Sequence, residues 1–386
     1  MSVYLDTAAT AMYKENDDII IKTIVNAMKT YWKNPSSLYA SSTKDKIDSC
    51  RKILAKSINS KSSEVYFCSS GSEANSFAIS GFVKQCKKNS KIPIVITSTI
   101  EHKSIIKCVE DIDAEVHFVD VNKYGIINIE KLYELLEYVT QKNKDRSIEI
   151  LVSIQYINGE IGTIQNIKEI ATLTHKYKGV FHTDAVQAYP HIFIDVQDVS
   201  IDLMSVSAHK ISPVLKGIGF LYIRDNVEIS PIIYGNQENN MRGGTENTAY
   251  IIGMAKAVEL LKNERSAKKD LTIITKRNYF ISKLREFGCT VNGSLDNRLS
   301  NNINVTFPNI TGEALVYMLD TAGIFISTGS ACNSHSIEPS NTLKAIGLSD
   351  IEAIKTVRFT LSDDITEEQI DKVIDEIRKA IKIVGV

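Results

Sequence analysis

Residues 205–210 read Ser-Val-Ser-Ala-His-Lys and end an apolar run that begins at Ile201. A second strand-like run, residues 179–184 (Gly-Val-Phe-His-Thr-Asp), ends earlier in the chain at Asp184. A lysine directly after a buried strand is poorly placed as a solvated cation, but it is well placed as a reactive amine. From about residue 13 to residue 257, strand-like runs alternate with helix-length amphipathic segments. This alternation predicts an α/β fold with a mainly parallel sheet covered on both faces.

Lys210 and Asp184 together have the chemistry that pyridoxal phosphate requires. The cofactor needs an amine that forms a Schiff base with its aldehyde, and a carboxylate that keeps the ring nitrogen protonated. Ligands of parallel sheets bind at the carboxyl ends of the strands, where both residues are expected. The pair therefore indicates a pyridoxal-phosphate site at this edge of the sheet.

Other polar side chains are also expected just after strands. The Ser-Ser-Gly-Ser loop at 69–72 suits a phosphate, because glycine permits close approach and a following helix offers free N–H groups. The same loop is also typical of a helix N-cap. His102 could stack on the cofactor ring. A histidine at the end of a strand is more often an ordinary, half-exposed residue without such a role. Gln187 could donate to the ring's phenolic oxygen, and Ser207 and His209 could bind phosphate.

Composition limits the function classes. The 386 residues allow one large domain and a smaller one. The 45 basic and 46 acidic residues give a net charge of -1, which predicts no direct nucleic-acid or membrane binding. No apolar run is long enough to span a membrane, and residues 1–6 do not resemble a signal peptide, so a cytoplasmic location is expected. The six cysteines lie far apart, which argues against a structural metal site or disulfides.

The regular alternation of strand-like and helical segments ends past about residue 251. A long helical segment, 251–287, leads into short strands at 302–307 and 356–360, and a last amphipathic helix covers 366–384. We expect a large cofactor-binding domain at 13–257 and a smaller α+β domain formed by 1–12 and 258–386.

Motifs along nearly the whole chain match those of one family, in that family's order. They include residues 4–10, 34–37, 71–75, 101–103, 160–162, 182–187, 207–210, 216–219, 241–245, 327–332 and 358–360. The chain thus resembles the pyridoxal-phosphate-dependent cysteine desulfurases (NifS/IscS-like) of the class V aminotransferase group. The resemblance implies fold type I, with a mainly parallel seven-stranded sheet, and a homodimer.

The resemblance also implies residue roles. Lys210 would hold the cofactor, Asp184 would pair with the ring nitrogen, His102 would stack and Gln187 would meet the phenolic oxygen. Phosphate would be bound by Ser72, Ser207, His209 and, from the neighbouring subunit, Thr245. Arg358 and Asn34 would bind the substrate, with the Arg358 guanidinium on its carboxylate.

The resemblance gives Cys332 the role of sulfur acceptor. It would attack the sulfur of L-cysteine, become a persulfide and leave L-alanine, for delivery to scaffold or acceptor proteins in iron–sulfur cluster assembly or tRNA thiolation. Two alternatives remain: a pyridoxal-phosphate lyase acting on another cysteine derivative such as selenocysteine, and a catalytically weak relative acting as a sulfur-transfer partner.

Four departures from the family pattern fall near the expected site. Gly159 stands where an asparagine usually touches the cofactor, and Asn158 would compensate only if the backbone shifted. Ala40 replaces a frequent histidine, the 211–215 loop is one residue longer and lacks a glycine, and 234–238 lacks part of a glycine run.

Overall fold

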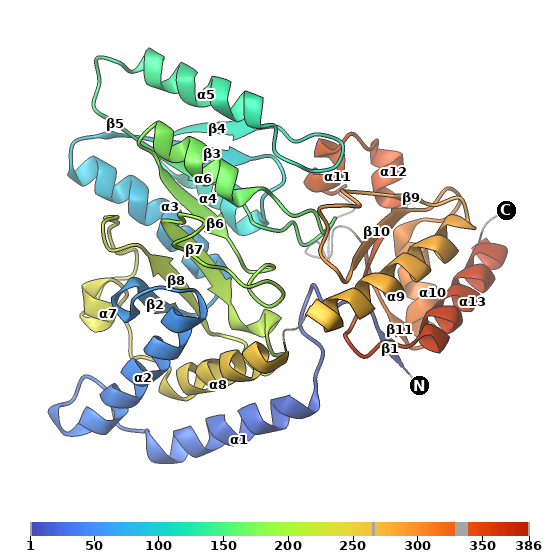
Figure 1. The fold of residues 1–386 in the computed structure, drawn as a ribbon, viewed down its shortest axis with the longest axis horizontal. Helices are drawn as coiled ribbons and strands as arrows, with labels where there is room; N and C mark the ends of the chain where they lie inside the picture. Colours follow the sequence, from blue (N-terminus) through green and yellow to red (C-terminus); the bar gives the residue numbers. More distant parts are fainter. Residues whose placement is uncertain (1, 265–266, 329–338, 385–386) are drawn as a thin grey trace.

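The computed structural model describes residues 2–264, 267–328 and 339–384. The chain forms a larger part around one sheet and a smaller part that carries both ends of the chain (Figure 1). Among the described helices, none is both long and apolar enough to cross a membrane.

A seven-stranded sheet forms the centre of the larger part, as the resemblance implied. Only β8 runs antiparallel to its neighbours, and the other adjacent pairs are parallel. The order across the sheet is β2 (Val65–Cys68), β8 (Gly219–Ile223), β7 (Leu203–Ser207), β6 (Val180–Asp184), β5 (Ile148–Ser153), β3 (Ile92–Ser98) and β4 (Glu115–Val119).

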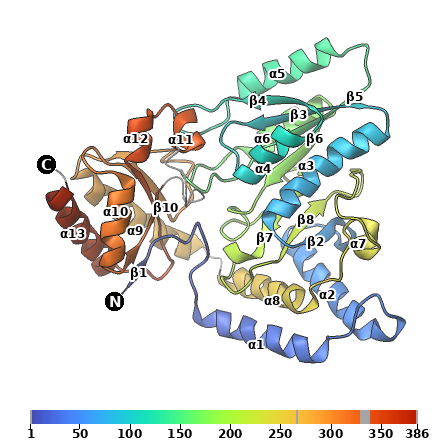
Figure 2. The ribbon, with the colours of Figure 1, turned by 180° about the vertical axis from the view of Figure 1, so that it is seen from behind.

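Helices cover both faces of this sheet. Strand side chains alternate between the faces, so Ile94 and Ile96 belong to one core while Val95 belongs to the other. The first core includes α1 (Glu15–Thr30), α2 (Ser41–Ser57), α5 (Ile129–Lys142), α6 (Ile167–Lys176) and α8 (Thr248–Glu264). The second includes α3 (Gly71–Lys88) and α4 (Lys103–Asp111). Figures 1 and 2, seen from opposite sides, show α6 over one face and α3 over the other.

The smaller part is built on antiparallel strands. Its four-stranded sheet has the order β12 (Ser327–Thr328), β13 (Thr356–Thr360), β10 (Asn302–Thr306) and β9 (Thr290–Val291). A separate parallel pair joins β1 (Val3–Tyr4) to β11 (Ile324–Phe325). The helices are α9 (Ala267–Arg285), α10 (Gly312–Thr321), α11 (Asn341–Ala345), α12 (Asp350–Ile354) and α13 (Glu367–Val384), and a short α7 (Gln237–Asn240) belongs to the larger part.

The division of the chain at 13–257 stays our proposal. It is supported by a hydrophobic core of the smaller part that draws on residues 3–5 and 280–380 and is separate from the two cores of the large sheet. The helical segment expected at 251–287 is described as two helices, α8 and α9, and α8 continues past the proposed boundary to Glu264.

We predict that Phe359→Ala lowers the free energy of unfolding by about 3–5 kcal/mol, because it empties a well-packed site. Phe359 is fully buried and its ring centroid lies 5.0 Å from that of Phe280. Denaturant unfolding measures the loss. Tyr317→Ala, at a side chain that is 73% exposed, is the matched control and should change stability little. Equal effects of the two substitutions would contradict this packing.

Candidate active site

The candidate site lies where β6 and β7 end side by side. The two strands are parallel, with Asp184 opposite Ser205, so their carboxyl ends meet at one edge of the sheet. β7 continues directly into a single 3₁₀ turn, Ala208–Lys210. Strand pairing thus brings Asp184 and Lys210 to the same edge from separate parts of the sequence.

Asp184 is buried and held by two donors. Its Oδ1 accepts the Val186 amide at 2.9 Å, and its Oδ2 accepts the side-chain amide of Asn75 at 2.7 Å. Asn75, on α3, also donates to Ser104 Oγ at 3.0 Å. Asn75 was not among the expected site residues, although it lies in the stretch 71–75 that matches the family.

The start of α3 packs tightly against this edge. Ser70 caps the helix by accepting the Glu73 amide at 3.1 Å, so the N-cap interpretation of the loop holds for Ser70. A Cβ on Gly71 would lie 2.6 Å from Val186 Cγ2 and 3.2 Å from Ser207 Cβ, so only glycine permits this approach. Ser72 follows as an exposed residue at the positive end of the helix dipole.

The groups around Lys210 form a donor set that fits a phosphate. Ser207 Oγ lies 2.8 Å from His209 Nδ1. Burial, together with the positive charges of Lys210, Lys216 and His102, lowers the pKa of His209 to about 4. This concentration of positive charge and hydroxyl donors suits a dianionic group, so the residues present fit pyridoxal phosphate.

His102 is the N-cap of α4 and is exposed. Its Nδ1 accepts the Ser104 amide at 3.1 Å and lies 2.8 Å from Ser104 Oγ. Ser104 also accepts from Asn75, so a chain of polar contacts runs from His102 to Asp184. A surface pocket lined by Ser72, Ser76, His102 and Ser104, among others, adjoins this chain.

Residues 8 and 9, from an early segment of the chain, contact Lys210 directly. Lys210 Nζ donates to the carbonyls of Ala8 (2.5 Å) and Ala9 (2.8 Å). Gln187 Nε2 donates to the same Ala8 oxygen at 2.9 Å. The sequence reasoning noted residues 4–10 only as a matching stretch and did not foresee these contacts.

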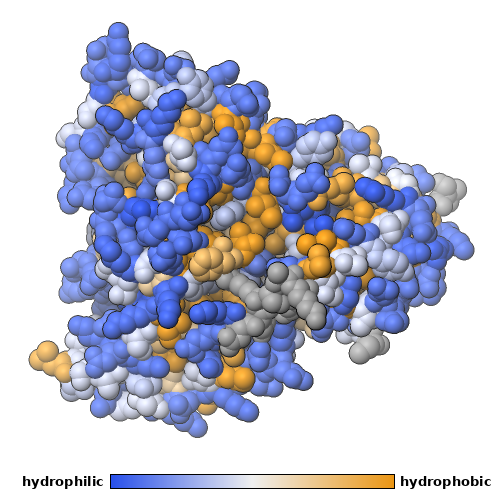
Figure 3. All heavy atoms as spheres, in the orientation of Figure 1, coloured by the Kyte–Doolittle hydropathy of each residue, from blue (hydrophilic) through white to orange (hydrophobic). Residues whose placement is uncertain are grey.

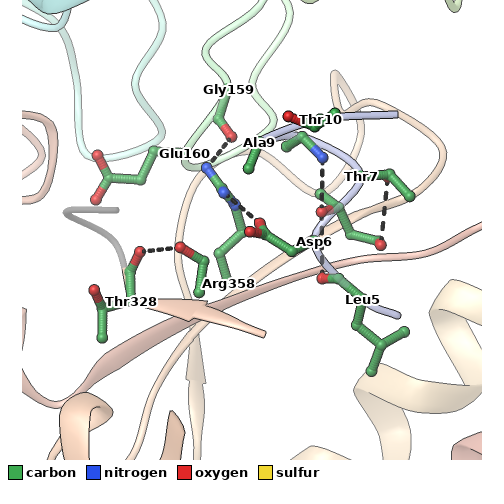
Figure 4. A network of polar contacts seen from close by, with 12 residues as sticks. Leu5, Asp6, Thr7, Ala9, Thr10, Gly159, Glu160, Thr328 and Arg358 are labelled. Atoms are coloured by element: carbon green, nitrogen blue, oxygen red, sulfur yellow. Dashed lines mark hydrogen bonds and ion pairs between the residues drawn. The ribbon is translucent and has the colours of Figure 1, made fainter. Parts of the chain in front are cut away.

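Arg358, on β13, reaches into the same region from the smaller part. Its Nη1 donates to the Gly159 carbonyl at 3.0 Å and its Nη2 to Asp6 Oδ1 at 2.6 Å. Figure 4 shows the guanidinium between these two partners. The side chain is buried, and its Nε has no hydrogen-bond partner among the described residues. This donor therefore lacks the partner that buried polar groups normally have.

Asn34, Thr245 and Cys332 are the expected site residues that make none of the contacts described above. Asn34 is exposed in the connection between α1 and α2, at the end of α1 away from the smaller part (Figure 1). Thr245 is exposed in the stretch before α8, where Arg242 pairs with Glu73 at 2.7 Å. Cys332 lies outside the described residues.

Gly159 has a local explanation. A Cβ there would lie 2.8 Å from Gln187 Nε2, so the Gln187 side chain occupies the space that a larger residue would need. Asn158 does not compensate, because its Oδ1 accepts the amides of Glu160 and Ile161, both at 2.9 Å, and its Nδ2 donates to the Ile100 carbonyl.

The two loops that depart from the family pattern, 211–215 and 234–238, also make specific contacts with the rest of the fold. Ser212 donates to Asp17 at the start of α1. Glu238, Asn239 and Asn240 all have positive φ (48°, 56° and 65°), and the buried Glu238 accepts two bonds from Arg51 (2.6 and 2.7 Å). This buried ion pair holds the unusual turn in place.

Comparison with known proteins agrees with these features. Residues 3–373 match the model of the family "Aminotransferase class-V". The chain belongs to this family. It is 39% identical to the cysteine desulfurase IscS of Dictyoglomus turgidum, over 98% of this chain and 94% of that protein. The members of this family use pyridoxal phosphate, and it is the cofactor of this protein as well.

Solved structures with the same fold cover nearly the whole chain. A "NifS-like protein" superposes with a TM-score of 0.88 at 28% identity, over 99% of this chain and 100% of the other. A structure described as "SspA in complex with cysteine" has a TM-score of 0.78 at 32% identity, over 93% and 99%. Together with the full-length IscS relatives, the NifS-like structure supports the cysteine desulfurase resemblance that the sequence motifs indicated.

A second buried carboxyl lies beside the site. Glu101 Oε1 accepts Ser98 Oγ at 2.5 Å, and both carboxyl oxygens accept the Gln155 amide at 3.1 and 2.9 Å. Burial raises the pKa of Glu101 to about 8; the charge of Asp184 adds to this, and the bonds from Ser98 and Gln155 oppose it. Glu101 therefore keeps its proton at neutral pH.

We predict that the contribution of Glu101 to stability falls as pH rises from about 4.5 to about 8, because the unfolded chain releases the Glu101 proton first. Glu101→Gln imitates the neutral acid and lacks this loss. Thermal midpoints measured across this range should therefore favour the variant increasingly as pH rises. Glu134→Gln, at an exposed helical position, is the control. Parallel curves for wild type and Glu101→Gln would rule out a buried neutral Glu101.

Proposed function

We propose that this protein is a cysteine desulfurase that converts L-cysteine to L-alanine and leaves the sulfur on Cys332 as a persulfide. The observation that carries the proposal is the buried Arg358 guanidinium. Its Nε has no partner among the described residues, and its Nη2 contacts Asp6, in the same segment as the Ala8 carbonyl that binds Lys210. An α-carboxylate is the natural ligand for such a guanidinium. The names of the relatives, and the cysteine bound in one related structure, support the same substrate.

Each residue of the site would have a distinct role in the reaction. Lys210 would hold the cofactor aldehyde covalently and move protons at the substrate Cα. Asp184, fixed by Asn75 and Val186, would hold a proton on the ring nitrogen. Pyridoxal phosphate, when bound, supplies an electron sink for the Cα–H bond electrons. Ser72, Ser207 and His209 would bind its phosphate, with His102 over the ring and Gln187 at the phenolic oxygen.

Sulfur transfer would be a reaction between two thiols. The Cys332 thiolate attacks the substrate sulfur, an S–S bond forms and the Cβ–S bond breaks. The electron pair stays with the substrate, which takes up a proton at carbon and leaves as alanine. In sum, L-cysteine and the Cys332 thiol give L-alanine and a Cys332 persulfide. We infer that acceptor or scaffold proteins then take the sulfur for iron–sulfur cluster assembly or tRNA thiolation in the cytoplasm.

We infer further that two copies form the working enzyme. Side chains exposed along α1 include Ile19, Ile21, Val25 and Met28, and those exposed after it include Trp32, Leu38 and Tyr39. Figure 3 shows apolar side chains at the tip of the α1–α2 connection. Apolar surface of this kind is typical of an interface. A partner copy would also bring Asn34 and Thr245, which are both exposed, to the neighbouring site.

The expected activity is release of alanine and sulfide in equal amounts from L-cysteine with a reductant. Lys210→Ala should abolish both products, because the amine that holds the cofactor is lost. Cys332→Ala should abolish sulfide release and the protein-bound persulfide. Cys289→Ala, which removes a buried thiol elsewhere, is the matched control and should retain activity. Wild-type protein that yields neither product above the Lys210→Ala level would refute the proposed function.

For the dimer, we expect that the double substitution Val25→Glu with Met28→Glu converts a dimer-sized particle to a monomer and lowers activity. Charges buried at an apolar interface are costly. Sedimentation velocity measures the particle size. Lys22→Glu, on the same helix, controls for added negative charge. A wild-type monomer at micromolar concentration, or a dimer that survives the double substitution, would show that α1 is not the interface.

A further inference from the structure

Asp6 is held rigidly beside Arg358 by backbone contacts on both sides. Tyr4 Oη donates to the carbonyls of Asp6 (3.1 Å) and Thr10 (3.0 Å). The Ala9 amide also donates to the Asp6 carbonyl at 3.0 Å. Asp6 forms a parallel bridge with Thr360, two residues beyond Arg358 on β13. The Asp6 backbone is therefore fixed, and its short side chain starts from a set position beside Arg358.

The ion pair itself is largely withdrawn from water. Arg358 and Asp6 side chains are 8% and 19% exposed, and Nη2 lies 2.6 Å from Oδ1. One N–H of Nη1 is bonded to Gly159 and one N–H of Nη2 to Asp6, and Nε has no partner among the described residues. A ligand carboxylate that binds any further N–H of this guanidinium must therefore lie close to the carboxylate of Asp6. Two negative charges at such a distance repel each other, more strongly where water is scarce.

We propose that Asp6 is a specificity-determining residue that acts through Arg358: it is a built-in carboxylate that competes with the substrate's carboxylate for the guanidinium and weakens substrate binding. This inference rests on the proposed function, since it takes an α-carboxylate as the ligand of Arg358. The occupied guanidinium keeps the site from binding simple carboxylates strongly. A ligand must gain further binding energy elsewhere in the site, as an amino acid does through its amine.

A purely structural role for Asp6 makes the opposite prediction. If Asp6 only oriented Arg358, its loss would leave the guanidinium misplaced and substrate binding weaker. If Asp6 competes, loss of its charge strengthens ground-state and transition-state binding together, which lowers KM and leaves kcat unchanged.

The test is Asp6→Asn in the holoenzyme, which keeps the shape and an acceptor oxygen but removes the charge. We expect KM for L-cysteine to fall at least about tenfold, with kcat within about twofold of wild type. The inhibition constant of propionate, a carboxylate with no amine, should fall by a similar factor. Asp320→Asn, an exposed carboxylate on α10, is the control and should change neither.

Two further measurements keep the outcome decisive. In an Arg358→Gln background, Asp6→Asn should no longer lower KM, because the effect passes through the guanidinium. Calorimetric binding of propionate to wild type and Asp6→Asn needs no turnover, so it tests the competition even if the wild type makes no alanine. An unchanged or raised KM and unchanged propionate affinity in a variant with wild-type thermal stability would overturn the proposal.

Discussion

The parallel pairing of β6 with β7 is the constraint on which the site depends. It places Asp184 and the turn that carries Lys210 at one edge of the sheet, although 18 residues (185–202) lie between the two strands. Both strands are buried on both faces by helices, so neither can slip in register without exposing apolar side chains. The loops that follow them are thus fixed by the core, and α3 packs against them through Gly71.

Much of this could be predicted from the sequence, because strands and strand ends have local signals. The alternation of apolar runs with amphipathic segments predicted the sheet, and the residues just after the runs predicted the edge. Contacts between distant segments had no such signal. Asn75 on Asp184 and Asp6 on Arg358 join residues 109 and 352 positions apart, and only the folded chain brings them together.

Gly159 departs from the family motif, and its contacts in the fold give this departure a structural reason. From the sequence alone it was a lost hydrogen bond to the cofactor. In the fold, Gln187 packs where a Cβ would project, and the carbonyl of Gly159 binds Arg358. The residue therefore supports Arg358 through its backbone. The Asn158 side chain is engaged in holding the turn itself together.

The segment around Asp6 also has a consequence for how the protein is made. The Thr360 amide donates to the Leu5 carbonyl at 2.7 Å, so a stretch pairs with one that is synthesised more than 350 residues later. Until the ribosome has released residues near 360, Ala8 and Ala9 have no strand to hold them against Lys210. Contacts of such long sequence separation form slowly. The large sheet can therefore assemble during translation while the pocket stays unfinished, so that no half-made chain presents a completed site.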